Sequence, residues 1–285
     1  RGAAGFRLDV ADELPDEFIE KVRAAVKRVS PEKFLLGEVW EDATTKFGFN
    51  KRRTYLLGKG LDSVMNYPFK NAVLDFVKGK PAEQAMTEIL TICEHYPAPA
   101  MDTALNFLST HDTERALTVI ADEPANGRGR AWQSGRCVTG DAYEEGLLRL
   151  RMAYAIIYTL PGVPCLYYGD EIAMQGYRDP FNRAFFRWDA HEQRLRPVLA
   201  QLAQLRHTCE AFRTGQLRVL RAEDGILHYQ RVGKVETAEI IVNRTEHIIV
   251  ETLASGKSTE VNPMGFTIVV EEVGHNPDHS YYDYV

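Results

Sequence analysis

The chain has 285 residues, of which 45% are hydrophobic and 26% charged, and its formal net charge is −6 at pH 7. This length suffices for one large domain, or for a large domain followed by a small one. The mild acidity and the lack of a Lys/Arg-rich stripe argue against a nucleic-acid surface. The longest apolar stretch, residues 152–168, is interrupted by Pro161, Gly162 and Pro164. It therefore predicts a helix, a turn and a buried strand, and not a membrane span.

Short apolar runs alternate with helical patterns along the first two thirds of the chain. Buried strands are predicted at 5–10, 34–39, 61–66, 104–109 and 164–169. Apolar residues at helical spacing predict amphipathic helices at 18–29, 147–157 and 195–205. This alternation is typical of an α/β fold, in which helices cover a parallel sheet. Five strand–helix units fit before about Cys209.

The pattern changes near Gly215 to short β-rich segments separated by turns such as "EDG" and "NPMG". No helix-length periodicity follows. We therefore expect two domains, a catalytic one over 1–212 and a small antiparallel β-sandwich of six to eight strands over 213–285.

The cysteines and histidines show no pattern of a metal site. The four cysteines are scattered without a CxxC pair, which favours reduced thiols over disulfides or a metal site. The histidines, apart from the one that follows the fourth predicted strand, show no ligand spacing. We expect neither a cofactor nor a metal.

The strand predicted at 5–10 carries charges within an apolar run. Phe6, Leu8 and Val10 share one face and are expected to pack against helices, whereas Arg7 and Asp9 share the other. In a barrel of parallel strands the second face points inward. The charged pair is then expected near the carboxyl end of the strand, where barrel enzymes hold their reactive groups.

Other predicted strands also end in acids. One ends in Glu38, one continues into His111 and Asp112, and one continues into Asp170 and Glu171. Clustered carboxylates disfavour the folded state unless the site uses them. Asp170 and Glu171 are expected to be structural acids at the rim.

Two carboxyl groups on either side of an acetal bond are the minimum for glycoside hydrolysis. One attacks the sugar, and the other must be protonated to help the leaving oxygen depart. Arg7 would keep Asp9 ionised, as a nucleophile requires. Glu38 has no adjacent arginine and has Trp40 nearby, so it is the better candidate for the acid.

Several segments resemble one enzyme family. "GFRLDVADE" (5–13), "LLGEVWEDA" (35–43) and "FLSTHDTE" (107–114) resemble, in order, three segments of the α-amylase family of retaining glycoside hydrolases. The stretch 162–188, "GVPCLYYGDEIAMQGYRDPFNRAFFRW", resembles the segment after that family's eighth strand. The wording of the first two segments, and "VMNYPF" at 64–69, is most similar to neopullulanases, cyclomaltodextrinases and maltogenic amylases.

The resemblance implies roles for the acids. Asp9 matches the nucleophile, Glu38 the general acid/base and Asp112 the third acid, which stabilises the transition state. Arg7 would support Asp9, and His111 would bind sugar hydroxyls.

Further residues would hold the sugars. Asp179 and Arg183 match residues that grip the sugar on the non-reducing side, and Trp40 is as well explained by a sugar platform as by packing. Glu13 and Asp12 lie where the family tunes the acceptor side. Asp12 departs from the asparagine usual in this group, which leaves acceptor preference open.

The resemblance also implies an architecture. The first matched segment ends the fourth of eight strands in the family, so we expect the C-terminal part (strands 4–8) of a TIM (β/α)8 barrel, followed by the sandwich. Strands one to three and their helices have no counterpart here. Read alone, such a chain would have an open sheet edge and an exposed apolar face.

The resemblance implies a retaining hydrolase of α-1,4 glucosidic bonds, with cleavage of α-1,6 bonds left open. The expected substrate is an α-glucan, a maltooligosaccharide or a cyclodextrin. Two alternatives stay open, a glycosyltransferase of the same family and an inactive fragment that serves as a scaffold. Calcium binds some family members through upstream residues. Many members of the group are intracellular, so a cytoplasmic location is expected.

Overall fold

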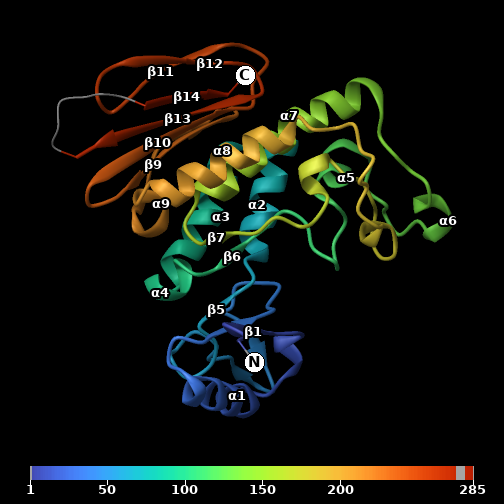
Figure 1. Cartoon of the computed structure of the whole chain (residues 1–285), viewed down its shortest axis with the longest axis vertical. Helices are drawn as coiled ribbons and strands as arrows, with labels where there is room; N and C mark the ends of the chain where they lie inside the picture. The colour runs from blue at the N-terminus through green and yellow to red at the C-terminus, as the bar shows by residue number, and fades with distance from the viewer. Residues whose placement is uncertain (1, 274–279, 285) are drawn as a thin grey trace.

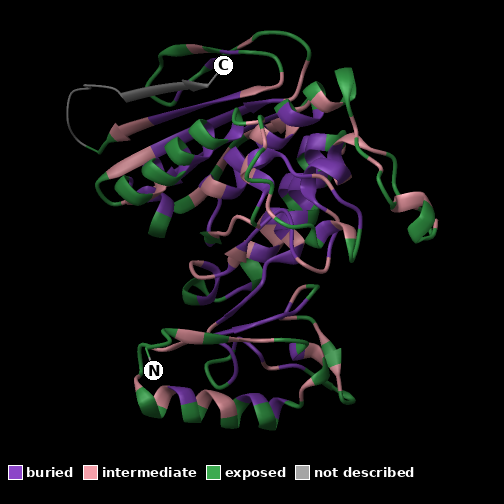
Figure 2. Ribbon diagram, turned by 45° about the vertical axis from the view of Figure 1, so that its right-hand side comes forward, coloured by how far each residue is buried: buried purple, intermediate pink, exposed green. Residues whose placement is uncertain are grey.

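The computed structural model describes residues 2–273 and 280–284. Figure 1 shows a small N-terminal part around α1 (Asp16–Val29) at one end of the molecule, helices in the middle and a β-sheet at the other end. Figure 2 shows that buried residues concentrate in the helical middle, whereas α1 exposes its outer side.

Parallel strands appear at the first four predicted places within the described residues. The fifth prediction, 164–169, overlaps the observed strand β7 at Pro164 only, and Val163 of that strand is 43% exposed instead of buried. β1, β2 and β5 form one sheet in that order, and β6 pairs with β7. A parallel bridge between Met65 and Leu105 joins the two sheets. The strands are β1 Gly5–Leu8, β2 Phe34–Gly37, β5 Ser63–Val64, β6 Leu105–Asn106 and β7 Val163–Pro164.

The observed parallel strands are shorter than predicted. Hydrogen bonds from buried asparagine side chains link the segments next to them. The Asn66 Nδ2 donates to Asn106 Oδ1 (2.9 Å), and Asn106 Nδ2 donates to the Pro161 carbonyl (2.7 Å). All of these groups are buried, so they require such partners. The turn before β7 needs glycine, because Gly162 has φ 105° and a Cβ there would lie 2.7 Å from the Ala104 carbonyl.

Helix α1 agrees with the prediction at 18–29. Acidic residues occupy its first turn and basic residues its last, which complements the helix dipole. Asp62 ties the helix to the sheet, since its carboxylate pairs with Arg23 (2.7 Å) and Lys27 (2.8 Å) and accepts from the Leu35 N–H (2.8 Å).

One expectation for β1 is wrong. Phe6 and Val10 are 55% and 49% exposed instead of packing against helices. The reason is that β1 has a strand neighbour on one side only among the described residues, and α1 packs beside β2.

Helices predicted at 147–157 and 195–205 are present as α7 and α8, and the pair α2 and α3 was not predicted. The Asn66 side chain caps α2 by accepting from the Phe69 N–H (3.2 Å). No helix among the described residues is long and apolar enough to cross a membrane. The helices are α2 Tyr67–Lys78, α3 Ala82–His95, α4 Ala98–Met101, α5 Ala116–Ala121, α6 Arg130–Gln133, α7 Gly140–Thr159, α8 Leu195–Thr208 and α9 Ala211–Thr214.

The C-terminal strands form an antiparallel sheet in the order β14-β13-β10-β9-β8, and β11 pairs with β12. Alternate residues of this sheet face opposite ways. Ile240 and Ile268 join the core made with the helices, whereas Ile241 and Val269 pack with Val261 of β12. The strands are β8 Gln216–Glu223, β9 Ile226–Val232, β10 Glu236–Asn243, β11 Ile249–Thr252, β12 Ser258–Val261, β13 Gly265–Glu272 and β14 Ser280–Tyr284, and a separate hairpin consists of β3 Phe47–Gly48 and β4 Lys51–Arg52.

The buried Arg231 and the half-buried Arg244 join this sheet to the helices. Arg231 of β9 donates to the Thr159 carbonyl at the end of α7 (2.7 Å) and to the Gly215 carbonyl. Arg244 donates to the Phe76 and Lys80 carbonyls at the end of α2. Arg231 thus satisfies the Thr159 carbonyl, which the end of α7 would otherwise leave without a donor.

Candidate active site

The predicted nucleophile and acid lie at the ends of neighbouring parallel strands. Arg7 of β1 contacts both, with 2.5 Å from Nη1 to Asp9 Oδ1 and 3.0 Å from Nη2 to Glu38 Oε1. The side chain of Asp9 is 68% exposed and that of Glu38 is 4% exposed. One guanidinium therefore contacts an open carboxylate and a buried one. The expectation that Glu38 has no arginine beside it is wrong, because Arg7 reaches it from the neighbouring strand.

Glu38 is held in place from two sides. The Val10 N–H donates to its Oε2 (2.9 Å), and the Tyr67 hydroxyl lies 3.5 Å from its Oε1. Val10 has φ 45°, a left-handed conformation that a β-branched residue rarely adopts. Backbone strain of this kind is typical of functional sites, where the surroundings hold it in place.

Tyr67 was missed as a site residue, although its segment was noted in the sequence. It is buried and stacks on Trp40, with ring centroids 4.3 Å apart and planes at 13°. Burial raises the pKa of Tyr67 well above its ordinary value, and the negative charges of Glu38 and Asp112 raise the pKa further. The phenol of Tyr67 is thus neutral at pH 7 and interacts electrostatically with both carboxylates. Trp40 is 42% exposed, which leaves part of its ring open to a ligand.

Asp112 lies in a second group, at the loop that follows β6. His111 Nε2 is 2.9 Å from Asp112 Oδ2, and Arg183 Nη2 is 3.3 Å from Asp112 Oδ1. Arg183 also pairs with Asp179 (3.1 Å). The structure therefore brings together all four residues that were predicted to bind sugar and stabilise charge on this side.

Asp170 and Glu171 have structural partners. Asp170 is buried and accepts from Arg115 (3.0 Å) and Tyr154 (2.7 Å). Burial raises the pKa of Asp170, while these donors oppose the rise. Glu171 accepts from the Gly169 N–H (2.7 Å). These contacts agree with the expected structural role.

The residues predicted for the acceptor side, Asp12 and Glu13, form a third group. Glu13 is exposed at the end of a short 3₁₀ turn, Ala11–Glu13. Asp12 accepts from the Tyr55 hydroxyl (2.8 Å) and pairs with Lys46 (3.2 Å). The sequence showed no signal for these partners, because Lys46 and Tyr55 flank the β3–β4 hairpin more than 30 residues downstream.

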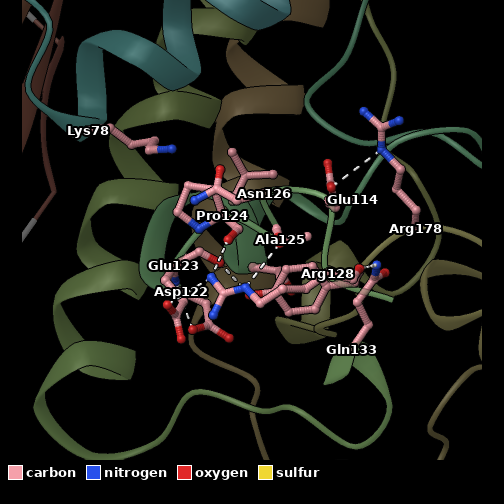
Figure 3. A pocket seen from close by; sticks show the side chains of 14 residues that line it. Lys78, Glu114, Asp122, Glu123, Pro124, Ala125, Asn126, Arg128, Gln133 and Arg178 are labelled. Carbon is pink, nitrogen blue, oxygen red and sulfur yellow. Dashed lines mark hydrogen bonds and ion pairs between the residues drawn. The ribbon is translucent and has the colours of Figure 1, made fainter. Parts of the chain in front are cut away.

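A cavity of about 400 Å³ lies away from the predicted catalytic acids. Figure 3 shows its wall of polar side chains, including Lys78, Asn126 and the ion pair between Glu114 and Arg178 (3.4 Å). Glu114 lies two positions after Asp112 in the sequence, and Arg178 directly precedes Asp179. None of the predicted catalytic residues lines it.

In the described part of the chain, no group of three or more His, Cys, Asp or Glu side chains could hold a metal ion. The cysteines are free thiols: Cys93 and Cys165 are half-buried, Cys137 is exposed and Cys209 is buried.

Several curated proteins are similar to this chain in sequence. An amylopullulanase from Thermoanaerobacter thermohydrosulfuricus is 32% identical over 246 residues, 81% of this chain and 15% of its own length. A cyclomaltodextrinase from Geobacillus thermopakistaniensis is 33% identical over 247 residues, 85% of this chain and 37% of its own length. The chain thus spans well under two thirds of either relative.

A solved structure has a similar fold. The ligand-free cyclic α-maltosyl-(1→6)-maltose hydrolase from Arthrobacter globiformis superposes with a TM-score of 0.80 at 25% identity, over 95% of this chain and 56% of that one. The family model described as alpha amylase, catalytic domain, matches residues 1–216. The fold is therefore of the TIM-barrel glycosidase type, and the chain belongs to the alpha-amylase family.

Proposed function

We propose that the protein containing this chain is an α-glucan hydrolase that retains the configuration of the sugar. The observation that carries the proposal is the bridge from Arg7 to both Asp9 and Glu38 at adjacent strand ends. Retaining enzymes need their two carboxyl groups about 5–5.5 Å apart. A single guanidinium that contacts both is consistent with such a pair.

The proposed reaction has two steps. In the first, Asp9 attacks the anomeric carbon, the bond to the leaving oxygen breaks, and protonated Glu38 gives its proton to that oxygen. In the second, the Glu38 carboxylate takes a proton from water, the water oxygen bonds to the anomeric carbon, and Asp9 is released. Asp112 stabilises the positive charge that develops on the sugar in both steps.

Binding residues surround this centre in the proposal. His111, Asp179 and Arg183 hold the sugar on the non-reducing side, where they already contact one another or Asp112. Trp40, supported by Tyr67, offers a sugar platform, and Glu13 lies toward the acceptor.

We also propose how the observed strands correspond to those of the complete barrel. We propose that β1, β2, β5, β6 and β7 correspond to strands 4–8 of the (β/α)8 barrel, within a domain of residues 1–212. Their parallel order supports this. We propose residues 213–285 as a β-sandwich domain, supported by the small apolar cluster between β11–β12 and the larger sheet.

The proposed substrates are maltodextrins, pullulan and cyclodextrins, cleaved at α-1,4 and α-1,6 bonds. The names of the relatives, amylopullulanase and cyclomaltodextrinase, support this class. The cytoplasmic location stays a prediction that cell fractionation can test.

The test begins with the intact protein from its natural source. Its mass shows whether the protein is longer than this chain, and by how much. The protein is then assayed on maltodextrin, pullulan and cyclodextrin, and proton NMR identifies the anomer that is released first. A fluorinated glycosyl fluoride should then trap an ester on the peptide that carries Asp9. Release of the β-anomer, or labelling elsewhere, contradicts the proposal. Transfer to excess maltose in place of water would instead identify a glycosyltransferase.

A further inference from the structure

A buried amide grips the loop that carries Asp112. Asn182, in the 3₁₀ turn Phe181–Arg183, is fully buried. Its Nδ2 lies 3.3 Å from the Thr110 carbonyl, 2.8 Å from that of His111 and 2.8 Å from that of Thr113. The contacts therefore fall on both sides of Asp112 in the sequence.

Other hydrogen bonds also hold this loop. Within it, Thr110 and Thr113 bond through their side chains, and the Asp112 N–H donates to Thr110 Oγ1 (3.1 Å). From outside, Arg183 donates to the His111 carbonyl (2.9 Å). The Asn182 NH₂ group has two protons and three carbonyl neighbours, of which those of His111 and Thr113 are the closer, so at least one proton is shared. Of the three carbonyls, that of His111 also accepts from Arg183.

The orientation of the amide follows from these contacts. If Asn182 were turned over, its oxygen would face three carbonyl oxygens. In the observed orientation the Oδ1 atom is buried without a hydrogen-bond partner among the described residues. An orphaned acceptor is unfavourable, so its presence indicates that the bonds made by the nitrogen outweigh it.

We propose that Asn182 is a positioning residue that fixes the backbone of residues 110–113 and thereby the carboxylate of Asp112. This rests on the proposed function, in which Asp112 stabilises the transition state. A displacement of about 1 Å in a catalytic group can lower the rate about 100-fold. Loss of the amide should therefore lower kcat more than it changes KM.

The chain offers a matched control in Asn243. This residue is also fully buried, and its Nδ2 donates to the carbonyls of His247 (2.8 Å), Val261 (3.1 Å) and Asn262 (3.0 Å). It lies at the end of β10, in the sheet and far along the chain from the predicted acids. Asn243→Ala removes the same kind of clamp without touching the Asp112 loop.

The experiment compares variants of the complete protein on maltodextrin. Asn182→Ala should lower kcat about 10- to 100-fold with KM within about threefold, and Asn182→Ser, which keeps one donor, should recover part of the loss. Asn243→Ala should lower the melting temperature but leave kcat within about twofold. In the Asp112→Asn background, Asn182→Ala should cost little more, because both act through one group.

Three results would overturn the proposal. One is a folded Asn182→Ala variant with the kcat of the unsubstituted protein. Another is a loss equal to that of Asn243→Ala. The third is a loss that multiplies fully with Asp112→Asn. If Asn182→Ala does not fold, the same comparisons apply to Asn182→Ser. Full activity of Asp112→Asn or Glu38→Gln would instead count against the proposed function.

Discussion

Replacement of Glu38 by glutamine separates the proposed acid/base chemistry from binding. The carboxylate forms an ion pair with Arg7 at one oxygen and accepts a hydrogen bond from the Val10 N–H at the other. Glutamine keeps one acceptor, so one of these two donors faces an NH₂ group. The lost charge-assisted bond should cost about 1.5–3 kcal/mol of stability, which leaves room for a folded protein.

The effect on rate should be larger. General acid–base catalysis contributes about 10²- to 10⁴-fold, which is about 2.7–5.4 kcal/mol at 1.36 kcal/mol per factor of ten. We therefore expect kcat on maltodextrin to fall by that factor in Glu38→Gln, while the affinity for maltooligosaccharides survives.

The assay uses two leaving groups. Maltosyl fluoride needs no proton to depart, so Glu38→Gln should release a burst of fluoride equal to the enzyme concentration and then turn over slowly. Glu41→Gln, an exposed acid in the same segment, is the control and should stay near the original rate. A Glu38→Gln rate on maltodextrin within about threefold of the original would refute the assignment.

Three further predictions concern stability and thiols. Arg53→Met removes the buried partner of the Asp16 carboxylate, which keeps only Lys51 at 3.4 Å, and removes the donor to the Asp12 and Leu14 carbonyls. It should lower the free energy of unfolding in urea by about 3 kcal/mol, whereas exposed Arg52→Met should cost under about 1 kcal/mol, and equal losses would contradict the burial argument. Burial raises the pKa of Asp62, but its ion pairs and hydrogen bonds lower it more, so the net pKa lies below 3.8. Its stabilisation is therefore present at neutral pH and is lost progressively as the pH falls below about 4, so Asp62→Asn should destabilise by about 1–3 kcal/mol at pH 7 and by less at pH 2.5, whereas a loss independent of pH would contradict this reasoning. Among the four thiols, exposed Cys137 should react first with a thiol reagent at pH 8, as peptide mapping can show, and earlier labelling of another would be inconsistent with burial. Burial raises the pKa of the others, Cys93 to about 11, Cys209 to about 12 and Cys165 in the same direction.

Local patterns in the sequence determined the elements and the family. The period of apolar residues predicted α1, α7 and α8, and apolar runs predicted the places of the parallel strands, because both depend on neighbours within a few residues. The ordered acids within matching segments pointed to the alpha-amylase family, which the family model confirms. The roles of Asp9, Glu38 and Asp112 stay predictions.

Only the tertiary structure decided how these residues are held. Tyr67 reaches Glu38 across 29 positions, and Asn182 reaches Thr110 across 72. No periodicity encodes such contacts, since they depend on how separate strands and loops pack. The exposure of Phe6 was mispredicted for the same reason. A strand alternates its faces by local geometry, but whether anything covers a face depends on the rest of the fold.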